Sequence, residues 1–180
     1  MDNNAVPTKG NLIRAKNSLK LAKQGYELMD KKRNILIREL MGLVDQAKDI
    51  QAEIRTTFTT AYAALQRADM ELGINAVADV ARNVPIEDTV EVKTRSIMGT
   101  EIPLVRYDAA TRTPAYAFYS TRESLDIARV SFEKVKDLTI KLSAVENSAY
   151  QLAANIKKAQ KRANALKNIT IPRYEALTKD

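Results

Sequence analysis

The chain has 180 residues, a formal net charge of +7, no Cys and no His. These absences exclude thiolate nucleophiles, disulfide bonds, imidazole acid–base catalysis and the usual zinc sites. The five Gly are isolated from one another, which also excludes the Gly-rich loops that bind nucleotides. We therefore expect no catalytic, cofactor or metal site, and a protein that is not an enzyme by itself.

Targeting and membrane segments are not expected. The opening residues MDNNAVPTKGN contain no apolar core of the kind that a signal peptide needs. No stretch approaches the roughly 18 uncharged apolar residues of a membrane span. With only five Pro beside the five Gly, the composition favours long uninterrupted elements in a cytoplasmic protein.

The first predicted element is a helix over residues 8–72, capped by Thr8 or Asn11. Steps of alternately three and four residues meet an apolar side chain at twelve of thirteen positions, and Arg33 is the exception. Holding this repeat over six heptads predicts a left-handed supercoil with a partner helix. The thirteen positions are Leu12, Ala15, Leu19, Ala22, Tyr26, Met29, Arg33, Leu36, Leu40, Leu43, Ala47, Ile50 and Ile54.

The middle segment covers residues 73–120. The first helix is expected to stop at Gly73 or to fray over residues 74–82. A β-hairpin is predicted at about residues 89–106, because the sequence alternates there as a strand does. Its tight turn is predicted at Met98-Gly99-Thr100, and Pro103 makes the second strand an edge. The aromatic residues that follow are interpreted as a packing patch for the hairpin; they are Tyr116, Phe118 and Tyr119.

The third predicted segment is a second helix over residues 121–180. The same spacing again finds twelve apolar positions of thirteen, with Thr139 the exception. Pro172 is expected to kink or end this helix. The thirteen positions are Leu125, Ala128, Phe132, Val135, Thr139, Leu142, Val145, Ala149, Leu152, Ile156, Ala159, Ala163 and Leu166.

The two stripes have nearly equal length, which favours one helix folding back along the other. Pairing their ends gives residue numbers that add to 178 or 179, and this register places Leu40 beside residues 138–139. Gly25 and Gly42 have two open interpretations, close approach of another chain or simple tolerance, and close approach is favoured at Gly25. The predicted fold is all-α dominated: a long antiparallel two-helix coiled-coil hairpin with a small middle insertion that contains a β-hairpin.

Charge is unevenly distributed along the chain. Residues 8–60 carry 11 basic and 6 acidic residues, residues 121–180 carry 12 and 7, and residues 61–120 carry 6 and 8. A basic face near the end of the second helix has three open interpretations: a solvated face, a surface for an acidic protein partner, or a nucleic-acid surface. The last is disfavoured because aromatic residues do not interleave with it. This face consists of Lys157, Lys158, Lys161 and Arg162.

Three sequence blocks carry a resemblance. They are PTKGNLIRAKNSLKLAKQGYELMDKKRNILIREL near the start, SIMGTEIPLVRY in the middle and KRANALKNITIPRYEALTKD at the end. In this order and spacing they resemble the D subunit of the V-type and archaeal-type rotary ATPases. Tyr26 stands where that family commonly has His. The family's chains usually run some tens of residues past the position of Asp180, so the last segment is expected to be a shortened form.

The resemblance implies a non-catalytic rotor shaft that transmits torque between the ATP-driven ring and the membrane rotor. The implied partners are the catalytic A and B subunits, the small F subunit of the central stalk and the membrane-rotor socket, in a hetero-oligomer. The implied location is cytoplasmic and peripheral to the membrane, without direct membrane insertion and without nucleic acid. The resemblance does not indicate whether the complex mainly makes or consumes ATP. It also leaves open whether the transported ion is a proton or sodium.

Two groups of contact residues follow from the matching blocks. The first is expected near the top of the shaft, facing the ring: Lys9, Arg14, Lys16, Lys157, Lys158, Lys161, Arg162 and Asn164. The second is expected to face the small stalk partner or to regulate the ring: Ile97, Met98, Gly99, Thr100, Glu101, Ile102, Pro103, Leu104 and Val105. The alternatives are a free-standing coiled-coil scaffold or adaptor, and a basic binder of nucleic acid or membrane surfaces.

Overall fold

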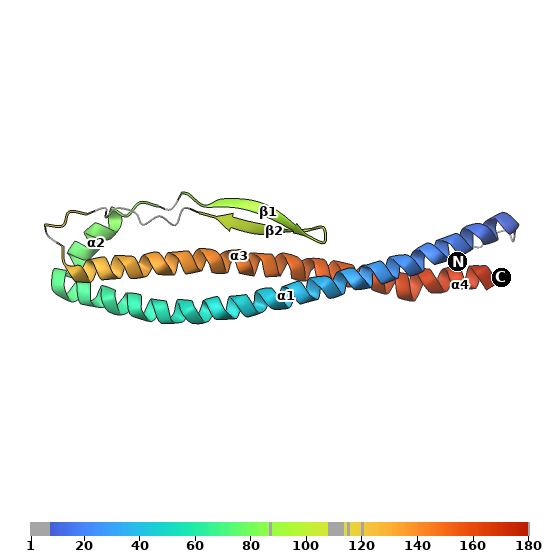
Figure 1. Cartoon of the computed structure of the whole chain (residues 1–180), viewed down its shortest axis with the longest axis horizontal. Helices are drawn as coiled ribbons and strands as arrows, with labels where there is room; N and C mark the ends of the chain where they lie inside the picture. The colour runs from blue at the N-terminus through green and yellow to red at the C-terminus, as the bar shows by residue number, and fades with distance from the viewer. Residues whose placement is uncertain (1–7, 87, 108–113, 115, 120, 180) are drawn as a thin grey trace. The chain divides into compact units, whose positions relative to one another are not determined.

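The computed structural model describes residues 8–86, 88–107, 114, 116–119 and 121–179. It confirms a fold dominated by two long helices with a small two-stranded antiparallel sheet between them in the chain (Figure 1). The expectation about a signal peptide rests largely on residues 1–7, which lie outside the described residues. The elements are α1 (Lys9–Leu72), α2 (Ile74–Arg82), β1 (Glu91–Ile97), β2 (Thr100–Arg106), α3 (Glu123–Ala165), the π-helical turn η1 (Leu166–Thr170) and α4 (Ile171–Lys179).

The chain forms two compact units. Unit 1 comprises residues 1–41, 96–100 and 150–180, and unit 2 comprises residues 42–95 and 101–149. Each unit contains a stretch of α1 that runs antiparallel to a stretch from the C-terminal half of the chain (Figure 1). The units cut across the three segments predicted from the sequence, and that three-part division stays a proposal.

Helix α1 begins and ends as the local sequence requires. The Thr8 hydroxyl accepts a hydrogen bond from the Asn11 amide at 3.2 Å, so Thr8 is the N-cap. At the other end Gly73 has φ 89°, a conformation that costs little only for Gly. Residues 74–82 do not fray: they form the separate helix α2, which the sequence did not predict.

The apolar stripes are the packed faces of the long helices. Of the thirteen predicted positions on α1, only Leu12 is exposed, while Leu36 is fully buried. On the second stripe only Thr139 is exposed, and the adjacent Leu138 is buried in its place. Burial of these side chains from water is the main source of stability for such a helix pair, since isolated helices are marginal.

The predicted register of the two helices is wrong. In unit 1 the Arg33 guanidinium donates to Gln160 Oε1 at 2.7 Å, and these residue numbers add to 193. In unit 2 Gln51 Nε2 donates to Glu146 Oε1 at 3.1 Å, and these add to 197. Both sums exceed the predicted 178 or 179, by 14 to 19 residues, which is two to nearly three heptads. A heptad stripe looks the same after a shift of two repeats, so the stripe alone could not distinguish the registers.

A crosslinking experiment checks the observed register, because the chain has no Cys of its own. Leu40 lines the same cleft as Ala153 and Ile156. Cysteines at positions 40 and 153, or 40 and 156, are expected to be joined efficiently by a short bismaleimide. Cysteines at 40 and 139 are the control and should stay unjoined; efficient crosslinking of that pair instead would restore the predicted register.

Pro172 does not end the second helix. A π-helical turn, Leu166–Thr170, leads directly into α4, which contains Pro172. The Ile171 amide donates to Leu166 O, five residues back, and the Thr170 hydroxyl donates to Ala165 O at 3.4 Å. Pro lacks an amide hydrogen and its ring collides with the carbonyl four residues earlier. The wider turn lets the helix continue past this obstacle.

Two Gly residues inside α1 are not required by contacts within the chain. A Cβ at Gly25 would lie 3.7 Å from Leu166 Cδ1, an ordinary contact distance. The close approach of another chain at Gly25 stays a prediction. A Cβ at Gly42 would meet no atom within 4 Å. Gly42→Ala is therefore expected to raise the free energy of unfolding of the isolated chain by about 0.5–1 kcal/mol. Urea titration followed by circular dichroism checks this, and a loss of stability would contradict it.

Helix α2 closes a small core in unit 2. Val77 of α2 packs with Ala68 of α1 and Leu125 of α3, and Tyr116 lies against this cluster. The Tyr116 hydroxyl donates to the Asp126 carboxylate. Burial, followed by this hydrogen bond, raises the pKa of Tyr116. Tyr116 thus packs against helices rather than the hairpin, and Phe118 and Tyr119 are exposed, so the predicted aromatic packing patch is wrong.

Candidate partner-binding surfaces

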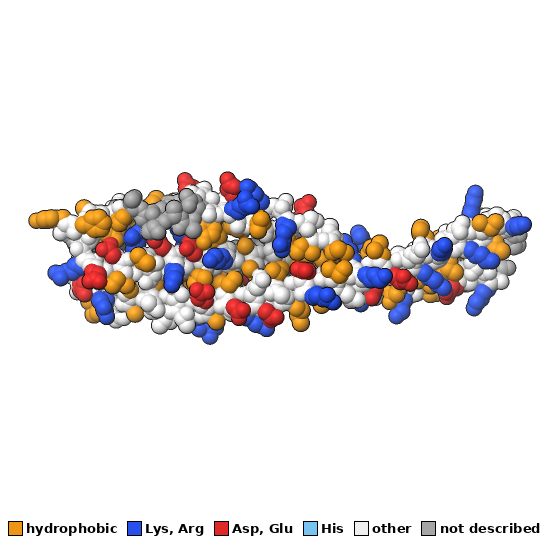
Figure 2. Space-filling view, in the orientation of Figure 1, with side chains coloured by type: hydrophobic (Ala, Val, Ile, Leu, Met, Phe, Trp, Pro, Cys, Tyr) orange, Lys and Arg blue, Asp and Glu red, His pale blue; other side chains and the backbone are white. Residues whose placement is uncertain are grey.

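Charge is divided between the two units. Unit 1 contains 16 of the 29 Lys and Arg residues and 6 of the 22 Asp and Glu residues, a formal charge of +10. Unit 2 contains the other 13 Lys and Arg residues and the other 16 Asp and Glu residues, a formal charge of −3. Lys and Arg predominate on the visible surface of the helices near the two chain termini (Figure 2). A surface of this kind attracts acidic partners and increases their rate of association.

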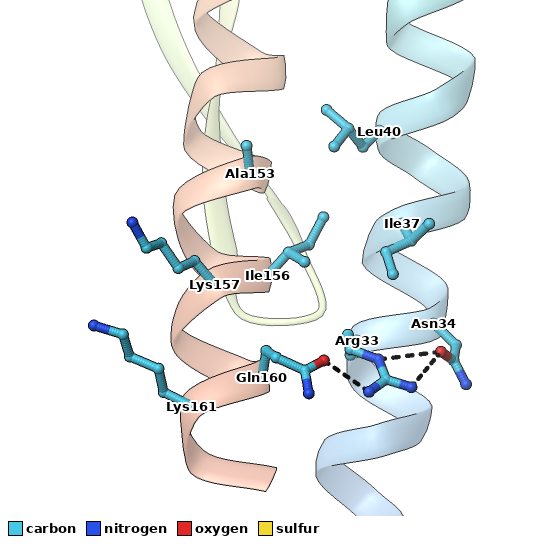
Figure 3. A pocket seen from close by; sticks show the side chains of 9 residues that line it. All are labelled: Arg33, Asn34, Ile37, Leu40, Ala153, Ile156, Lys157, Gln160 and Lys161. Carbon is cyan, nitrogen blue, oxygen red and sulfur yellow. Dashed lines mark hydrogen bonds between the residues drawn. The ribbon is translucent and has the colours of Figure 1, made fainter. Parts of the chain in front are cut away.

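A shallow cleft of about 570 Å³ lies between α1 and α3 in unit 1. Its apolar walls include Ile37 and Leu40 from α1 and Ile156 from α3 (Figure 3). Lys157 and Lys161 also line it, and Figure 3 shows their side chains directed away from α1. Their ammonium groups are therefore available to a partner that covers the cleft.

A polar network closes one end of this cleft. The Arg33 guanidinium donates to Gln160 (Figure 3). It also forms an ion pair with Asp30 at 2.6 Å. Gln160 in turn donates to Asn164 Oδ1 at 2.8 Å. A polar contact inside an apolar seam favours one register over its alternatives. The sequence analysis did not identify Arg33 as a contact between the helices, although its place as the single exception in the first stripe was the signal.

The predicted ring-facing residues fall into two separate groups. All eight are exposed, and all lie in unit 1. The group on α3 lies beside Arg33, whereas Lys16 comes 17 residues before Arg33 in α1. At about 1.5 Å per residue, that separation is roughly 25 Å along the helix. The structure therefore does not bring the residues Lys9, Arg14 and Lys16 together with the group at 157–164.

An ion pair ties α4 to α1 in unit 1. Lys23 Nζ lies 2.7 Å from Glu175 Oε1. The hydrogen bond and the positive charge of Lys23 lower the pKa of Glu175. Because the folded-state pKa is lowered, the pair's contribution to stability is present above the ordinary Glu value of 4.5 and is lost as the pH falls through the folded-state value.

Lys23→Met is expected to raise the pKa of Glu175 toward 4.5, because the donor and the charge are both removed. Carboxyl-detected NMR titration of the two chains checks this. Lys20→Met, on the same exposed helix surface, is the control and should leave the Glu175 titration unchanged. An equal pKa in the wild-type chain and in Lys23→Met would contradict the pairing.

The hairpin residues differ in their accessibility. Met98 and Gly99 form its two-residue turn, with φ 51° and φ 73°. Thr100 and Ile102 are buried within the chain, so they do not face a partner in this conformation. The other members of the predicted group are exposed or half-buried and stay candidates: Ile97, Met98, Gly99, Glu101, Pro103, Leu104 and Val105.

Within the described part of the chain, no three or more acidic side chains gather as metal ligands would. None of the described helices combines the length and the apolarity needed to cross a membrane. The groups available for recognition are therefore charged side chains, shallow clefts and strand edges. This arrangement defines an antiparallel coiled-coil hairpin protein with a β-hairpin insertion.

Comparison with known proteins identifies the particular family. Residues 11–180 match the family described as the D subunit of ATP synthase, and the chain belongs to this family. It is 40% identical to the V-type ATP synthase D subunit of Thermotoga neapolitana, over 97% of this chain and 86% of that protein. It is 35% identical to the A-type ATP synthase D subunit of Thermococcus kodakarensis, over 98% of this chain and 84% of that protein. The resemblance seen in the sequence is thereby confirmed.

Proposed function

We propose that this protein is the central rotor shaft of a V/A-type rotary ATPase. The shaft transmits torque between ATP hydrolysis or synthesis in a catalytic ring and ion transport in a membrane rotor. The chain itself catalyses nothing. In this proposal it works in the cytoplasm, peripheral to the membrane, as one member of a hetero-oligomer with the A and B subunits, the small F subunit of the stalk and the membrane-rotor socket.

The observation that carries this proposal is the small-residue seam between the long helices. Buried seam positions in both units include Ala22, Ala128, Ala159 and Ala163. Small side chains let two helices approach closely, so each pair stays thin. A thin packed pair resists bending and twisting better than a single helix, while leaving its charged outer surface available to a surrounding ring.

The basic character of unit 1 supports the same function. Torque requires contacts that hold in one orientation and release in the next, which favours solvated charges over a large apolar interface. Exposed Lys and Arg side chains form such contacts with acidic partners, because exposed ion pairs are individually weak. Lys157, Lys158, Lys161 and Arg162 are proposed to face the ring in this way.

Affinity purification of the tagged chain from its native cells tests the proposal. Recovery of P-loop ATPase subunits and a small stalk protein, with one copy of this chain per complex, is the expected result. Recovery of the chain as a homodimer would favour the free-standing scaffold instead. Recovery with nucleic acid, released steeply by salt, would favour a basic binder.

A further inference from the structure

The β-hairpin is attached to the rest of the chain near its turn. Thr100 and Ile102 of β2 are 1% and 3% exposed, and Ile97 of β1 is half-buried. The other residues of β1, from Glu91 to Ser96, are all exposed. A two-stranded hairpin has no core of its own and is marginally stable in water. Its position therefore depends on the few side chains that it buries beside the turn.

Thr100 opposes this attachment. Its hydroxyl is buried and makes no hydrogen bond within the described part of the chain. Such a hydroxyl has lost its hydrogen bonds to water without replacement, which favours release of the hairpin. Burial of the Ile102 side chain favours attachment, because it removes apolar surface from water. The two effects are of similar size and opposite sign, so the attached state is favoured only slightly.

The polar contacts between the hairpin and the helices add little. Among the described residues, one hydrogen bond links the two strands to a helix: the buried Ser148 hydroxyl of α3 lies 3.4 Å from Pro103 O. The same hydroxyl donates at 2.7 Å to Ala144 O within α3, so it keeps its stronger partner when Pro103 leaves. At the turn, a Cβ at Gly99 would meet only the flexible end of Lys32 within 4 Å, at 3.9 Å. Release of the hairpin therefore breaks one weak hydrogen bond.

We propose that the β-hairpin is a latch that leaves α1 and α3 while these helices stay packed together. In the closed state Thr100, Ile102 and Ser148 are buried, as in the structure. In the open state water reaches all three side chains, and the Thr100 hydroxyl regains hydrogen-bond partners. Local opening of this kind requires less free energy than global unfolding, because few apolar contacts are lost. Any partner that binds the open state better than the closed state shifts the balance toward it.

The latch goes beyond the proposed function, because it is a property of the isolated chain. Residues 97–105 are the group expected to face the small stalk partner or to regulate the ring. Two of them, Thr100 and Ile102, become accessible only in the open state. The latch would therefore control when this group is complete. Its test needs no other subunit, so failure of the latch and failure of the rotor-shaft function are distinguishable.

Cysteine alkylation measures opening, because the chain has no Cys of its own. Ser148→Cys becomes reactive when the hairpin leaves, whereas Ala61→Cys, fully buried on α1 in the same unit, becomes reactive when the helices separate. Iodoacetamide is added to each folded chain, and each rate is divided by the rate in the urea-unfolded chain. Ser148→Cys is expected to react at least about tenfold faster than Ala61→Cys. Equal rates would mean that the hairpin opens only when the helices unfold, and would overturn the latch.

Substitutions in the Ser148→Cys chain test what holds the latch closed. Thr100→Val keeps the side-chain shape and removes the unpaired hydroxyl, so alkylation is expected to slow by about tenfold. Ile102→Ala removes most of the apolar contact and should accelerate alkylation by about tenfold or more. Thr94→Val and Leu104→Ala, both at exposed positions of the hairpin, are the matched controls and should change the rate little. Unchanged rates in both Thr100→Val and Ile102→Ala would overturn the latch.

A second reporter keeps the latch testable if Ser148→Cys disturbs the fold. Thr100→Cys keeps a side chain of nearly the same size as Thr, and it is exposed only when the hairpin opens. Its alkylation should also exceed that of Ala61→Cys, and Ile102→Ala should accelerate it further. Circular dichroism confirms that each chain keeps its helices, so that an altered rate reports on the hairpin alone. Alkylation of Thr100→Cys as slow as that of Ala61→Cys would overturn the latch.

Discussion

Leu36→Ala is expected to lower the free energy of unfolding of the isolated chain by about 3 kcal/mol. Leu36 is fully buried in the seam of unit 1, so truncation removes apolar contacts and leaves a cavity that the two helices can close only partly. Urea titration followed by far-ultraviolet circular dichroism measures the change. The effect should be large compared with any surface substitution in the same helix.

Leu21→Ala is the matched control, because Leu21 has the same side chain in the same helix but is 71% exposed. Its effect is expected to stay within about 0.5 kcal/mol. Equal losses from the two substitutions would show that the seam does not hold the helices together. A small loss at both positions would mean that the pairing in unit 1 contributes little to stability.

Reversing two charges at the end of α3 is expected to uncouple the proposed machine without unfolding the chain. Lys161 and Arg162 are exposed, and Lys161 lines the cleft of unit 1. Lys161→Glu with Arg162→Glu turns attraction toward an acidic surface into repulsion, which costs several kcal/mol for close charges at an interface. We expect the ATP-driven rotation or ion transport of the reconstituted complex to fall at least about tenfold.

The control reverses two exposed charges in unit 2, Lys134→Glu with Lys141→Glu. This pair changes the net charge equally and lies outside the basic surface. Thermal unfolding of each isolated chain should be close to that of the wild type. If the variant Lys161→Glu with Arg162→Glu assembles normally and keeps full ATP-driven rotation and ion transport, this result would count against a torque-bearing role for Lys161 and Arg162.

Much of the fold could be predicted because helix periodicity reports directly on burial. A side chain that must avoid water recurs on one helix face, and the stripe from Ala15 to Ile54 recorded that face correctly. The hairpin turn could be predicted for a similar local reason, since a two-residue turn with positive φ favours Gly99. The register between the two long helices could not be predicted in this way. It depends on which heptad of one helix lies beside which heptad of the other, and the heptads are similar to one another.

The residues that indicate how the two helices pair are the ones that break the apolar stripes. Arg33 interrupts the first stripe, and in the structure it meets Gln160, which lies outside the second stripe. No rule of spacing pairs an Arg with a Gln across 127 residues of chain. The predicted ring-facing residues came from the matching blocks of the family instead, and whether they contact a ring stays a prediction.

The sequence left two outcomes open at Pro172, a kink or an end of the helix, and in the structure the helix continues through a π-helical turn. Sequence rules treat Pro172 as a helix breaker, and an isolated helix would follow them. In this chain α4 gains the ion pair between Lys23 and Glu175 and packs against α1, so continuing the helix is favoured over ending it. Such contacts come from tertiary structure, and no local window of sequence contains them.

The π-helical turn at Leu166–Thr170 has a consequence for comparing members of the family. Such a turn is what a helix looks like when one residue has been added to it without unwinding the rest. Heptad letters assigned upstream therefore fall out of step by one position from Ile171 onward. An alignment that carries the upstream phase through Pro172 would label inward-facing side chains as outward-facing ones. Counting anew from Ile171 restores the correct face for each position of α4.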